Sequence, residues 1–342
     1  MEDRFRHILR EDLDQIFLSD LPWQDLNGKR ILITGATGML ASYLVHFLLY
    51  LSQEKDMDIK VLALCRNKGK AETMFGNSDA LKILEQDICS PLDIEGEVDL
   101  IFHFAGNASP YFINTDPVGI CRTNLTGTFN VAELARKKSA SVIFASTREV
   151  YGKNEEAGML DEKAFGTSDC MEDRACYPES KRAAETVLHS YFLQYGVPVY
   201  VLRIAHVFGP GMRIENDGRV MSDFISDAVA GRDIILKSDG TAIRAFCYIT
   251  DAISGIFTAL MKGRQGEAYN LADETHPLTI RKAAELTAEA AGVHVRTEIG
   301  TNMQGYCNYR RTGLDTSRLE SLGWKPNTGI EEAITRTIES FR

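Results

Sequence analysis

The sequence lacks the features of a membrane, secreted or metal-binding protein. Its most apolar stretch, residues 39–51, is too short to span a bilayer, and its first residues have neither the basic start nor the apolar core of a signal peptide. The seven cysteines are scattered and form no CxxC pair, which is typical of reduced thiols rather than of a disulfide framework or a zinc site. We therefore expect a cytoplasmic protein with no membrane partner and no metal.

An excess of positive charge is also absent. The 342 residues include 38 Lys and Arg and 48 Asp and Glu, which gives a net charge of −10. A general nucleic-acid-binding protein usually carries the opposite sign, so we expect no nucleic-acid partner. Apolar residues make up 44% and charged residues 25% of the chain, the balance of an ordinary globular protein. An anionic small molecule would bind only where arginines gather locally.

Short apolar runs alternate with helical patterns through the first two thirds of the chain. The runs are residues 30–34, 60–64, 81–84, 100–104, 141–145 and 199–204, and helical patterns cover 39–51 and 124–137. This alternation predicts an α/β protein with a Rossmann-type, doubly wound parallel sheet. We expect a helical extension over 1–28, a dinucleotide-binding domain over 29–205 and a smaller C-terminal α/β substrate domain over 206–342. Segment 245–272, which includes another helical pattern, is expected to return to the first domain.

A glycine turn follows the first predicted strand, in the pattern Thr34-Gly35-xx-Gly38-xx-Ala41. Gly35 permits a tight turn, Gly38 lets the backbone approach a pyrophosphate at the positive end of the next helix, and Ala41 allows close packing of helix on strand. Glycine also serves ordinary turns, so the pattern gains its weight from its place between a strand and a helix. It predicts dinucleotide binding.

The second predicted strand ends in a basic stretch, Cys65-Arg66-Asn67-Lys68. An acidic residue there would bind the adenosine ribose hydroxyls of NAD, whereas Arg66 would suit the 2′-phosphate of NADP. Asp87 and Ile88, after the third strand, are placed to meet the adenine. A solvated basic turn and an ordinary surface aspartate are the alternatives, so the residues leave NAD and NADP both open.

Tyr177 and Lys181 are four residues apart in a helical stretch and therefore lie on one face of that helix. Free tyrosine has a pKa of about 10, so a tyrosine base near neutral pH needs its phenolate stabilised by about 4 kcal/mol. A lysine ammonium and a positive nicotinamide would supply that stabilisation. Thr147 and Glu149 follow another predicted strand, at the sheet edge where ligands bind in such folds.

Six motifs occur in the order found in the extended short-chain dehydrogenase/reductase family. They are the glycine turn, His103-Phe104-Ala105-Gly106, Asn124-Leu-Thr-Gly-Thr, Ser146-Thr147-xx-Val150-Tyr151-Gly152, Tyr177-xxx-Lys181 and Arg203-Ile-xxx-Phe208-Gly209-Pro210. The similarity runs from about residue 28 to the C-terminus. Within this family of nucleotide-sugar epimerases, dehydratases and decarboxylases, segments 108–110, 146–152, 216–220 and 244–246 most resemble the UDP-glucuronate decarboxylases.

The resemblance implies chemistry on a nucleotide-diphosphate sugar through a transient 4-ketone, with NAD recycled in the site and NADP kept open by Arg66. Tyr177 removes the proton from the sugar 4-hydroxyl while hydride passes to the nicotinamide. Lys181 lowers the pKa of Tyr177 and holds the nicotinamide ribose. Thr147 forms a hydrogen bond with the 4-oxygen of the sugar, and Glu149 lies near C5 and C6 of the sugar.

The resemblance also implies two sets of binding residues. The cofactor would contact Gly35, Thr37, Gly38, Met39, Leu40, Arg66, Asp87, Ile88, Phe104, Ala105, Gly106, Asn124, Ala145, Tyr177, Lys181, Ile204 and His206. The substrate would contact Ser109, Arg148, His206, Arg219, Val220, Arg244 and Arg311. Family members commonly pair through helices of the cofactor domain, so we expect a homodimer through the segments around Asn124 and Lys181.

The favoured reaction is decarboxylation of UDP-glucuronate to UDP-xylose, and 4-epimerisation is the alternative. A net NADPH-dependent 4-ketosugar reductase and a non-catalytic NAD(P)-binding protein are the hypotheses of other classes. Arg148 stands where dehydratases carry an aspartate acid and decarboxylases usually carry serine, which disfavours dehydration because the leaving hydroxyl needs an acid. His206 stands where these enzymes usually have asparagine. Arg148 would pair with a substrate carboxylate or point outward.

Overall fold

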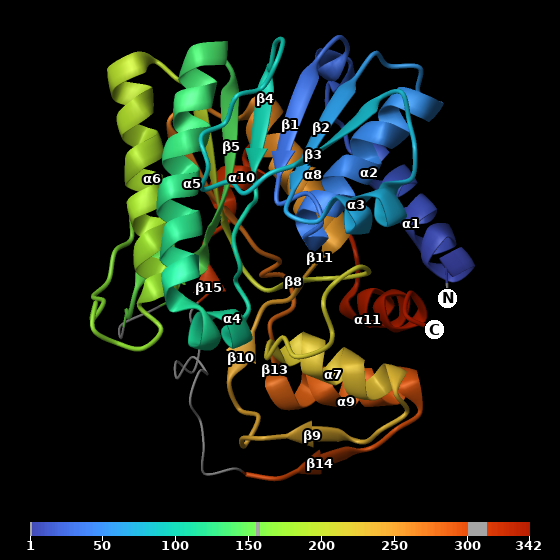
Figure 1. Ribbon diagram of the computed structural model, residues 1–342. Coiled ribbons are helices and arrows are strands. Elements are labelled where there is room, and N and C mark those ends of the chain that lie inside the picture. The colour runs from blue at the N-terminus through green and yellow to red at the C-terminus, as the bar shows by residue number, and fades with distance from the viewer. Residues whose placement is uncertain (1, 155–157, 300–312) are drawn as a thin grey trace.

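A seven-stranded parallel sheet forms the centre of the molecule (Figure 1). The computed structural model describes residues 2–154, 158–299 and 313–342. The strands lie in the order β12-β7-β5-β4-β1-β2-β3. Their bounds are β1 (Arg30–Thr34), β2 (Lys60–Cys65), β3 (Leu81–Glu85), β4 (Leu100–His103), β5 (Ser141–Thr147), β7 (Val199–Ile204) and β12 (Glu267–Leu271). The order runs outward from β1 in both directions, so the sheet is doubly wound and the predicted Rossmann-type α/β fold is confirmed.

The central strands are apolar because helices bury both faces of the sheet. In β1, Ile31 and Ile33 face one core while Leu32 faces the other, and none of the three has exposed surface. Such continuous apolar runs are typical of parallel strands covered on both sides. At the sheet edge, β3 is only partly buried.

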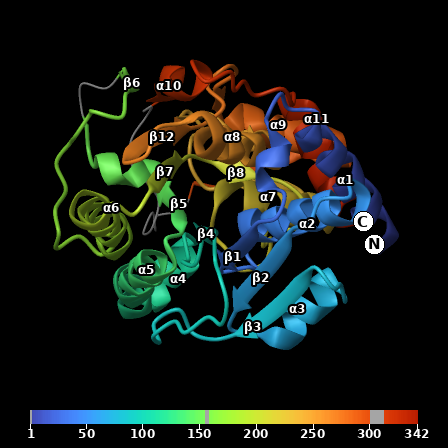
Figure 2. The same cartoon turned by 90° about the horizontal axis from the view of Figure 1, so that it is seen from above.

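Helices cover the two faces of the sheet (Figure 2). Their bounds are α2 (Met39–Glu54), α3 (Lys68–Phe75), α4 (Pro110–Thr115), α5 (Pro117–Lys138), α6 (Cys176–Tyr195) and α8 (Ile249–Lys262). Side chains of α5 and α6 pack into one core, and those of α2 and α8 into the other.

Helix α5 begins seven residues before the predicted start at Asn124. Pro117 suits its first turn, and the Asp116 side chain accepts a hydrogen bond from the Gly119 amide at 3.1 Å, so capping starts a helix that composition did not indicate.

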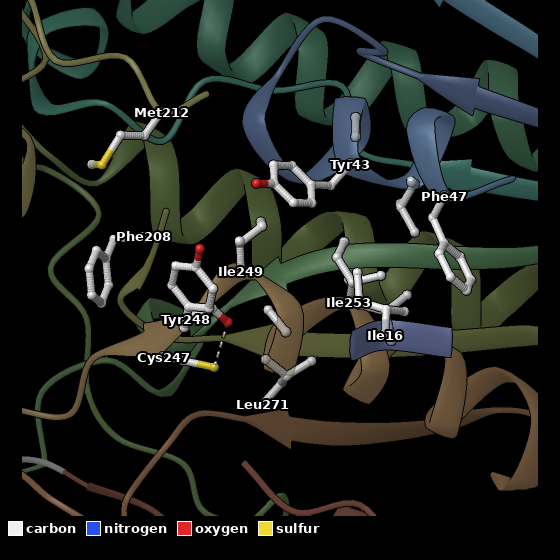
Figure 3. Packing of buried hydrophobic residues seen from close by; sticks show 14 of the residues in the cluster. Ile16, Tyr43, Phe47, Phe208, Met212, Cys247, Tyr248, Ile249, Ile253 and Leu271 are labelled. Atoms are coloured by element: carbon white, nitrogen blue, oxygen red, sulfur yellow. Dashed lines mark hydrogen bonds between the residues drawn. The ribbon is translucent and has the colours of Figure 1, made fainter. Parts of the chain in front are cut away.

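The core between α2 and α8 gathers residues from distant parts of the chain (Figure 3). Tyr43 and Phe47 of α2 lie near Ile249 and Ile253 of α8, and Ile16 comes from the N-terminal helix α1 (Glu2–Phe17). All five are 1% exposed or less. This packing ties the N-terminal helix to the sheet. The short helix η1 (Trp23–Leu26) connects α1 to β1.

A buried polar cluster joins α1 to the C-terminal helix α11 (Ile330–Glu339). The Asp12 carboxylate, which has no exposed surface, accepts hydrogen bonds from the Tyr43 hydroxyl at 2.8 Å, the Tyr248 hydroxyl at 3.0 Å and Arg336 Nη2 at 2.7 Å. Burial raises the pKa of Asp12, and the Arg336 charge and the hydroxyl donors oppose this rise. The carboxylate is thus held by groups from three separate parts of the chain.

A smaller lobe lies beyond the carboxyl ends of the strands, at the bottom of Figure 1. It contains α7 (Val220–Val229), β9 (Ile234–Leu236), β10 (Ile243–Arg244), β13 (Leu278–Thr279), α9 (Ile280–Ala291) and β14 (Val295–Thr297). The remaining short elements are η2 (Arg148–Tyr151), β6 (Met159–Leu160), β8 (Val207–Phe208), β11 (Cys247–Tyr248), β15 (Gly313–Leu314) and α10 (Ser317–Glu320). Within the described ranges, no helix is both long and apolar enough to cross a membrane.

Candidate active site

A cleft of about 1320 Å³ opens where the central strands end, with walls from both the sheet and the smaller lobe. One wall consists of the glycine turn after β1, the residues that follow each of β2, β3, β4 and β5, and the start of α6. Residues of α7 and β9 form the other. Ligands bind at this edge of doubly wound sheets. The volume lies above the usual range for a pocket that binds one small ligand.

The structure brings nearly all of the predicted site residues to this cleft. Thr147, Glu149, Tyr177 and Lys181 line it, as do the predicted cofactor contacts other than Asn124. The predicted substrate contacts line it too, except Arg311, which lies outside the described residues. Asn124 is buried behind Gly106 and donates from Nδ2 to Ser180 Oγ at 2.9 Å. Its Oδ1 lies 2.9 Å from where a Cβ on Gly106 would stand, so Asn124 shapes the cofactor wall without lining it.

The glycine turn has the geometry that a dinucleotide requires. Gly35 has a φ of +68°, and a Cβ there would come within 2.8 Å of Ala105 Cα, so only glycine fits without a backbone shift. Gly38 caps α2, whose N-terminus therefore opens onto the cleft. Backbone amides at a helix N-terminus favour a pyrophosphate. The residues at this turn fit the predicted dinucleotide.

The end of β2 is basic, as its sequence indicated. Arg66 and Lys70 line the cleft beside Asp87. The Cys89 amide donates to the Asp87 carboxylate at 2.9 Å and lowers the pKa of Asp87, and the charges of Arg66 and Arg122 lower it further. Asp87 is therefore an ionised acceptor at the predicted adenine end of the cleft.

Tyr177 and Lys181 lie one turn apart near the start of α6, and each is only 5% exposed. Burial raises the pKa of Tyr177, and the Glu149 charge raises it further. The largest opposing effects come from a hydrogen bond with Thr147 and from the charges of Arg219 and Arg174, not from Lys181. Lys181 is not among the largest effects on the pKa of Tyr177 within the chain, so its action on this pKa together with a bound nicotinamide stays a prediction.

Lys181 is held in place from the strand beside it. Its Nζ donates to the Ala145 carbonyl at 2.7 Å and lies 4.6 Å from the centre of the Phe144 ring. Burial lowers the pKa of Lys181 to about 8, and the Glu185 charge opposes this shift. Glu185 in turn accepts from Ser146 Oγ and from Arg203 Nη2, the latter at 2.7 Å. The lysine therefore titrates close to the physiological range.

Glu149 has a partner that sequence reasoning missed. Arg174 Nη2 donates to both carboxylate oxygens of Glu149, each at 3.1 Å. Arg174 lies on the turns before α6, in the charged stretch Glu172-Asp173-Arg174, and also lines the cleft. Nothing in that stretch distinguishes it from a solvated surface loop. Only its distance of three residues from Tyr177 offers a signal.

Predicted substrate residues come from both sides of the cleft, and a hydrogen bond connects the two sides. Arg219 pairs with Asp217, while Ser109 Oγ donates to the Asp217 carbonyl at 2.6 Å. The Ser109 hydroxyl therefore links the sheet side of the cleft to the loop that carries Arg219. This loop leads directly into α7 of the smaller lobe.

His206 lies between the sheet and the smaller lobe, close to Arg148 and Arg244. Burial lowers the pKa of His206 well below its usual value, and the charges of these two arginines lower it further. The His206 backbone has a φ of +49°, a conformation in which asparagine and histidine are both over-represented. The backbone at this position therefore suits histidine as well as the asparagine that the family resemblance leads us to expect. Arg148, at 6% exposure, points inward rather than into solvent.

No group of three or more His, Cys, Asp or Glu suited to a metal ion occurs among the residues that the structure describes.

A doubly wound sheet, a glycine turn that fits a pyrophosphate and a buried tyrosine–lysine pair define a dinucleotide-dependent α/β enzyme. The chain belongs to the NAD-dependent epimerase/dehydratase family, whose model matches residues 31–272.

Within the family, the chain is similar in sequence to UDP-glucuronic acid decarboxylases. UDP-glucuronic acid decarboxylase 6 of Arabidopsis thaliana is 32% identical over 313 residues, covering 92% of this chain and 89% of the relative. UDP-glucuronic acid decarboxylase 1 of Xenopus tropicalis is 34% identical over 314 residues, covering 92% and 72%. The predicted resemblance to UDP-glucuronate decarboxylases is confirmed.

Solved structures share the fold at lower identity. UDP-glucose 4-epimerase of Thermotoga maritima, solved with UDP-glucose, has a TM-score of 0.76 at 23% identity and covers 91% of this chain and 98% of its own. dTDP-glucose 4,6-dehydratase of Bacillus anthracis, solved with NAD, has a TM-score of 0.74 at 23% identity and covers 92% and 96%. The predicted class, an NAD-dependent enzyme of nucleotide sugars, is confirmed by the family and these relatives together.

Proposed function

We propose that this protein decarboxylates UDP-glucuronate to UDP-xylose, with NAD bound in the cleft and recycled. The observation that carries the proposal is the grouping of Thr147, Glu149 and Tyr177 in one cleft, in a chain about one third identical to decarboxylases of this substrate. Thr147 and Tyr177 share a hydrogen bond, so a sugar hydroxyl placed between them would meet both a donor and an acceptor.

The chemistry starts at C4 of the sugar. Tyr177 takes the proton of the 4-hydroxyl, and Thr147 holds the 4-oxygen. When bound in the cleft, NAD would accept the hydride from C4 and later return it, and its positive charge would oppose the effect of burial, which raises the pKa of Tyr177. The resulting 4-ketone is β to the C6 carboxylate, so carbon dioxide leaves and the electrons pass into an enolate. Protonation at C5 from solvent, followed by reduction of the 4-ketone as Tyr177 gives its proton back to the 4-oxygen, would complete the pentose.

Two arginines are suited to hold the diphosphate of the substrate. Arg219 and Arg244 both line the cleft, and a guanidinium matches the geometry of phosphate oxygens. Asp217 orients Arg219 through their ion pair. Arg311 is proposed for the same task from its sequence position alone.

One observation favours a second candidate, 4-epimerisation of the same substrate. Arg148 is buried beside His206, where decarboxylases usually have a small serine. A cation that binds the C6 carboxylate would stabilise it as a carboxylate and slow the loss of carbon dioxide. The 4-ketone would then be reduced from its other face, which inverts C4.

Incubation with UDP-glucuronate, UDP-glucose and dTDP-glucose, followed by mass spectrometry and NMR, tests the proposal. Loss of the mass of carbon dioxide from UDP-glucuronate supports decarboxylation. An unchanged mass with a new sugar spectrum supports the epimerase. Loss of the mass of water from either glucose nucleotide would contradict both, and turnover only with added NADPH and a 4-keto sugar would point to the reductase.

The same proposal includes the assembly and the setting of the enzyme. A homodimer through α5 and α6 is supported by apolar side chains left exposed on these helices, Phe129 at 50% and Leu193 at 71%. Light scattering that gives a monomer mass would contradict it. We place the enzyme in the cytoplasm, supplying a nucleotide sugar for polysaccharide biosynthesis, and cell fractionation tests the compartment.

A further inference from the structure

The buried face of the N-terminal helix α1 carries a carboxylate that binds a tyrosine behind the cleft. Asp12 has no exposed surface, and charged side chains are rarely buried so completely unless they are paired. Its carboxylate accepts from the Tyr248 hydroxyl at 3.0 Å, from the Tyr43 hydroxyl at 2.8 Å and from Arg336 Nη2 at 2.7 Å. The family model matches residues 31–272, so Asp12 lies outside the matched part of the chain.

Strand pairing connects Tyr248 to the wall of the cleft. Tyr248 is the second residue of β11, which pairs in parallel with β8, and its register partner is Phe208. The two ring centres lie 6.2 Å apart in an edge-to-face arrangement, and both side chains are 1% exposed (Figure 3). Phe208 also lines the cleft. Because protein interiors are close-packed and transmit strain, a shift of the Tyr248 ring would shift β8 with it.

The ring contacts continue to two predicted substrate residues. The Phe246 ring centre lies 6.2 Å from that of Phe208 and 6.0 Å from that of His206, each pair edge to face. His206 directly precedes β8, and Arg244 lies two residues before Phe246. All four residues line the cleft. Since edge-to-face rings prefer a narrow range of distances, this series fixes the positions of the wall residues relative to Tyr248.

We propose that Asp12 is a positioning residue of the nucleotide-sugar site, which acts through the Tyr248 hydroxyl on the wall that carries His206 and Arg244. Asp12 itself lies behind this wall and does not line the cleft. The inference rests on the proposed substrate contacts of the wall, and it adds a residue of α1 to the groups on which substrate binding depends.

The Tyr43 hydroxyl provides a comparison within the same cluster. Tyr43 donates to the same carboxylate but belongs to α2, whose N-terminus opens onto the cofactor side of the cleft. The two hydroxyls therefore connect one acceptor to two different walls. Removing either one costs a buried hydrogen bond to a charged group, so the two losses of stability should be similar. Only the loss of the Tyr248 hydroxyl should loosen the substrate wall.

Calorimetric titration of UDP, dTDP and NAD⁺ into the full chain tests the proposal. The proteins are wild type, Asp12→Asn, Tyr248→Phe and the matched control Tyr43→Phe, each shown to be folded by circular dichroism. Asp12→Asn and Tyr248→Phe should weaken UDP by about threefold to tenfold and leave the Kd for NAD⁺ within about twofold, because a displaced wall holds its ligand less well. Tyr43→Phe should leave the Kd for UDP within about twofold, although urea unfolding should show a loss of stability similar to that of Tyr248→Phe.

Equal losses of UDP affinity in Tyr248→Phe and Tyr43→Phe would overturn the proposal, because they would show a general loosening of the fold. Unchanged UDP binding in Tyr248→Phe would overturn it too, as would a wild type that binds neither UDP nor dTDP. The sugar assay judges the proposed reaction separately. A chain that shows the expected difference between the two tyrosine variants but releases no carbon dioxide from UDP-glucuronate would contradict the reaction alone.

Discussion

Arg174 and Glu149 form a partly buried ion pair in which one guanidinium nitrogen lies 3.1 Å from each carboxylate oxygen. Their side chains are 19% and 24% exposed, so water screens the pair less than it screens a surface salt bridge. Both charges act on Tyr177, Glu149 by raising its pKa and Arg174 by lowering it. The pair thus orients the carboxylate in the cleft and offsets its charge beside the tyrosine.

Removing Arg174 should impair turnover through Glu149. We expect Arg174→Met and Glu149→Gln each to lower kcat by about 10- to 100-fold, since each breaks the ion pair that holds the Glu149 carboxylate in a partly buried site. In the double variant the losses should not add, because both changes break the same interaction. Steady-state kinetics on the four proteins of this cycle gives the coupling directly.

A control is available on α5, where Arg136 pairs with Glu133 on the surface at 2.6 Å. Arg136→Met should leave kcat within about twofold of wild type, as expected for an exposed pair. Additive losses in the Arg174 and Glu149 cycle would show that the ion pair has no part in turnover.

Replacing the Tyr177 hydroxyl should separate binding from chemistry. Tyr177→Phe keeps the ring that packs in the cleft and removes the group that exchanges the proton. We expect kcat to fall by about a thousandfold, within the range of general acid–base catalysis, while the Kd values for UDP and for the cofactor stay within about twofold. Rapid kinetics and calorimetry measure the two quantities, and turnover close to the wild-type rate would remove Tyr177 from its assigned role.

The rate should depend on the protonation of Lys181. Burial lowers the pKa of Lys181 to about 8, so the ammonium is lost as pH rises through that value and kcat/KM should fall above it. The Glu185 charge raises this pKa, so Glu185→Gln should move the alkaline fall to lower pH. A loss of folded enzyme would lower the whole profile without moving it.

Profiles of kcat/KM recorded from pH 6 to 10 distinguish a shift of the alkaline limb from a uniform loss of folded enzyme. The matched control is Glu285→Gln, which changes an exposed glutamate on α9. An alkaline limb at the same pH in wild type and Glu185→Gln would exclude Lys181 as the group responsible.

The Asp12 cluster should hold the N-terminal helix in place. Asp12→Ala leaves Arg336 and two tyrosine hydroxyls without their shared acceptor, so we expect the free energy of unfolding to drop by about 3–5 kcal/mol. Glu11→Ala removes one exposed ion pair of the same arginine, and an exposed contact with His7, and should cost less than about 1 kcal/mol. Urea unfolding followed by tryptophan fluorescence measures both, and equal losses would contradict the role of burial.

Local patterns in the sequence were enough to predict the central sheet and the glycine turn. The apolar run of β1 predicts a strand buried on both faces, and the spacing of Gly35 and Gly38 predicts the turn that follows. The four-residue interval between Tyr177 and Lys181 places both on one face of a helix. These inferences depend on local periodicity and backbone freedom, which neighbouring residues already define.

The residues that surround these groups became visible only in the folded chain. Arg174 reaches Glu149 across 25 positions, and Arg336 reaches Asp12 across 324, so no local pattern reveals either pair. The pKa of Tyr177 also could not be read from its neighbours in the chain, because burial between strand ends and the smaller lobe raises it. Charge pairing and desolvation depend on distances through space, and those distances exist only once the chain has folded.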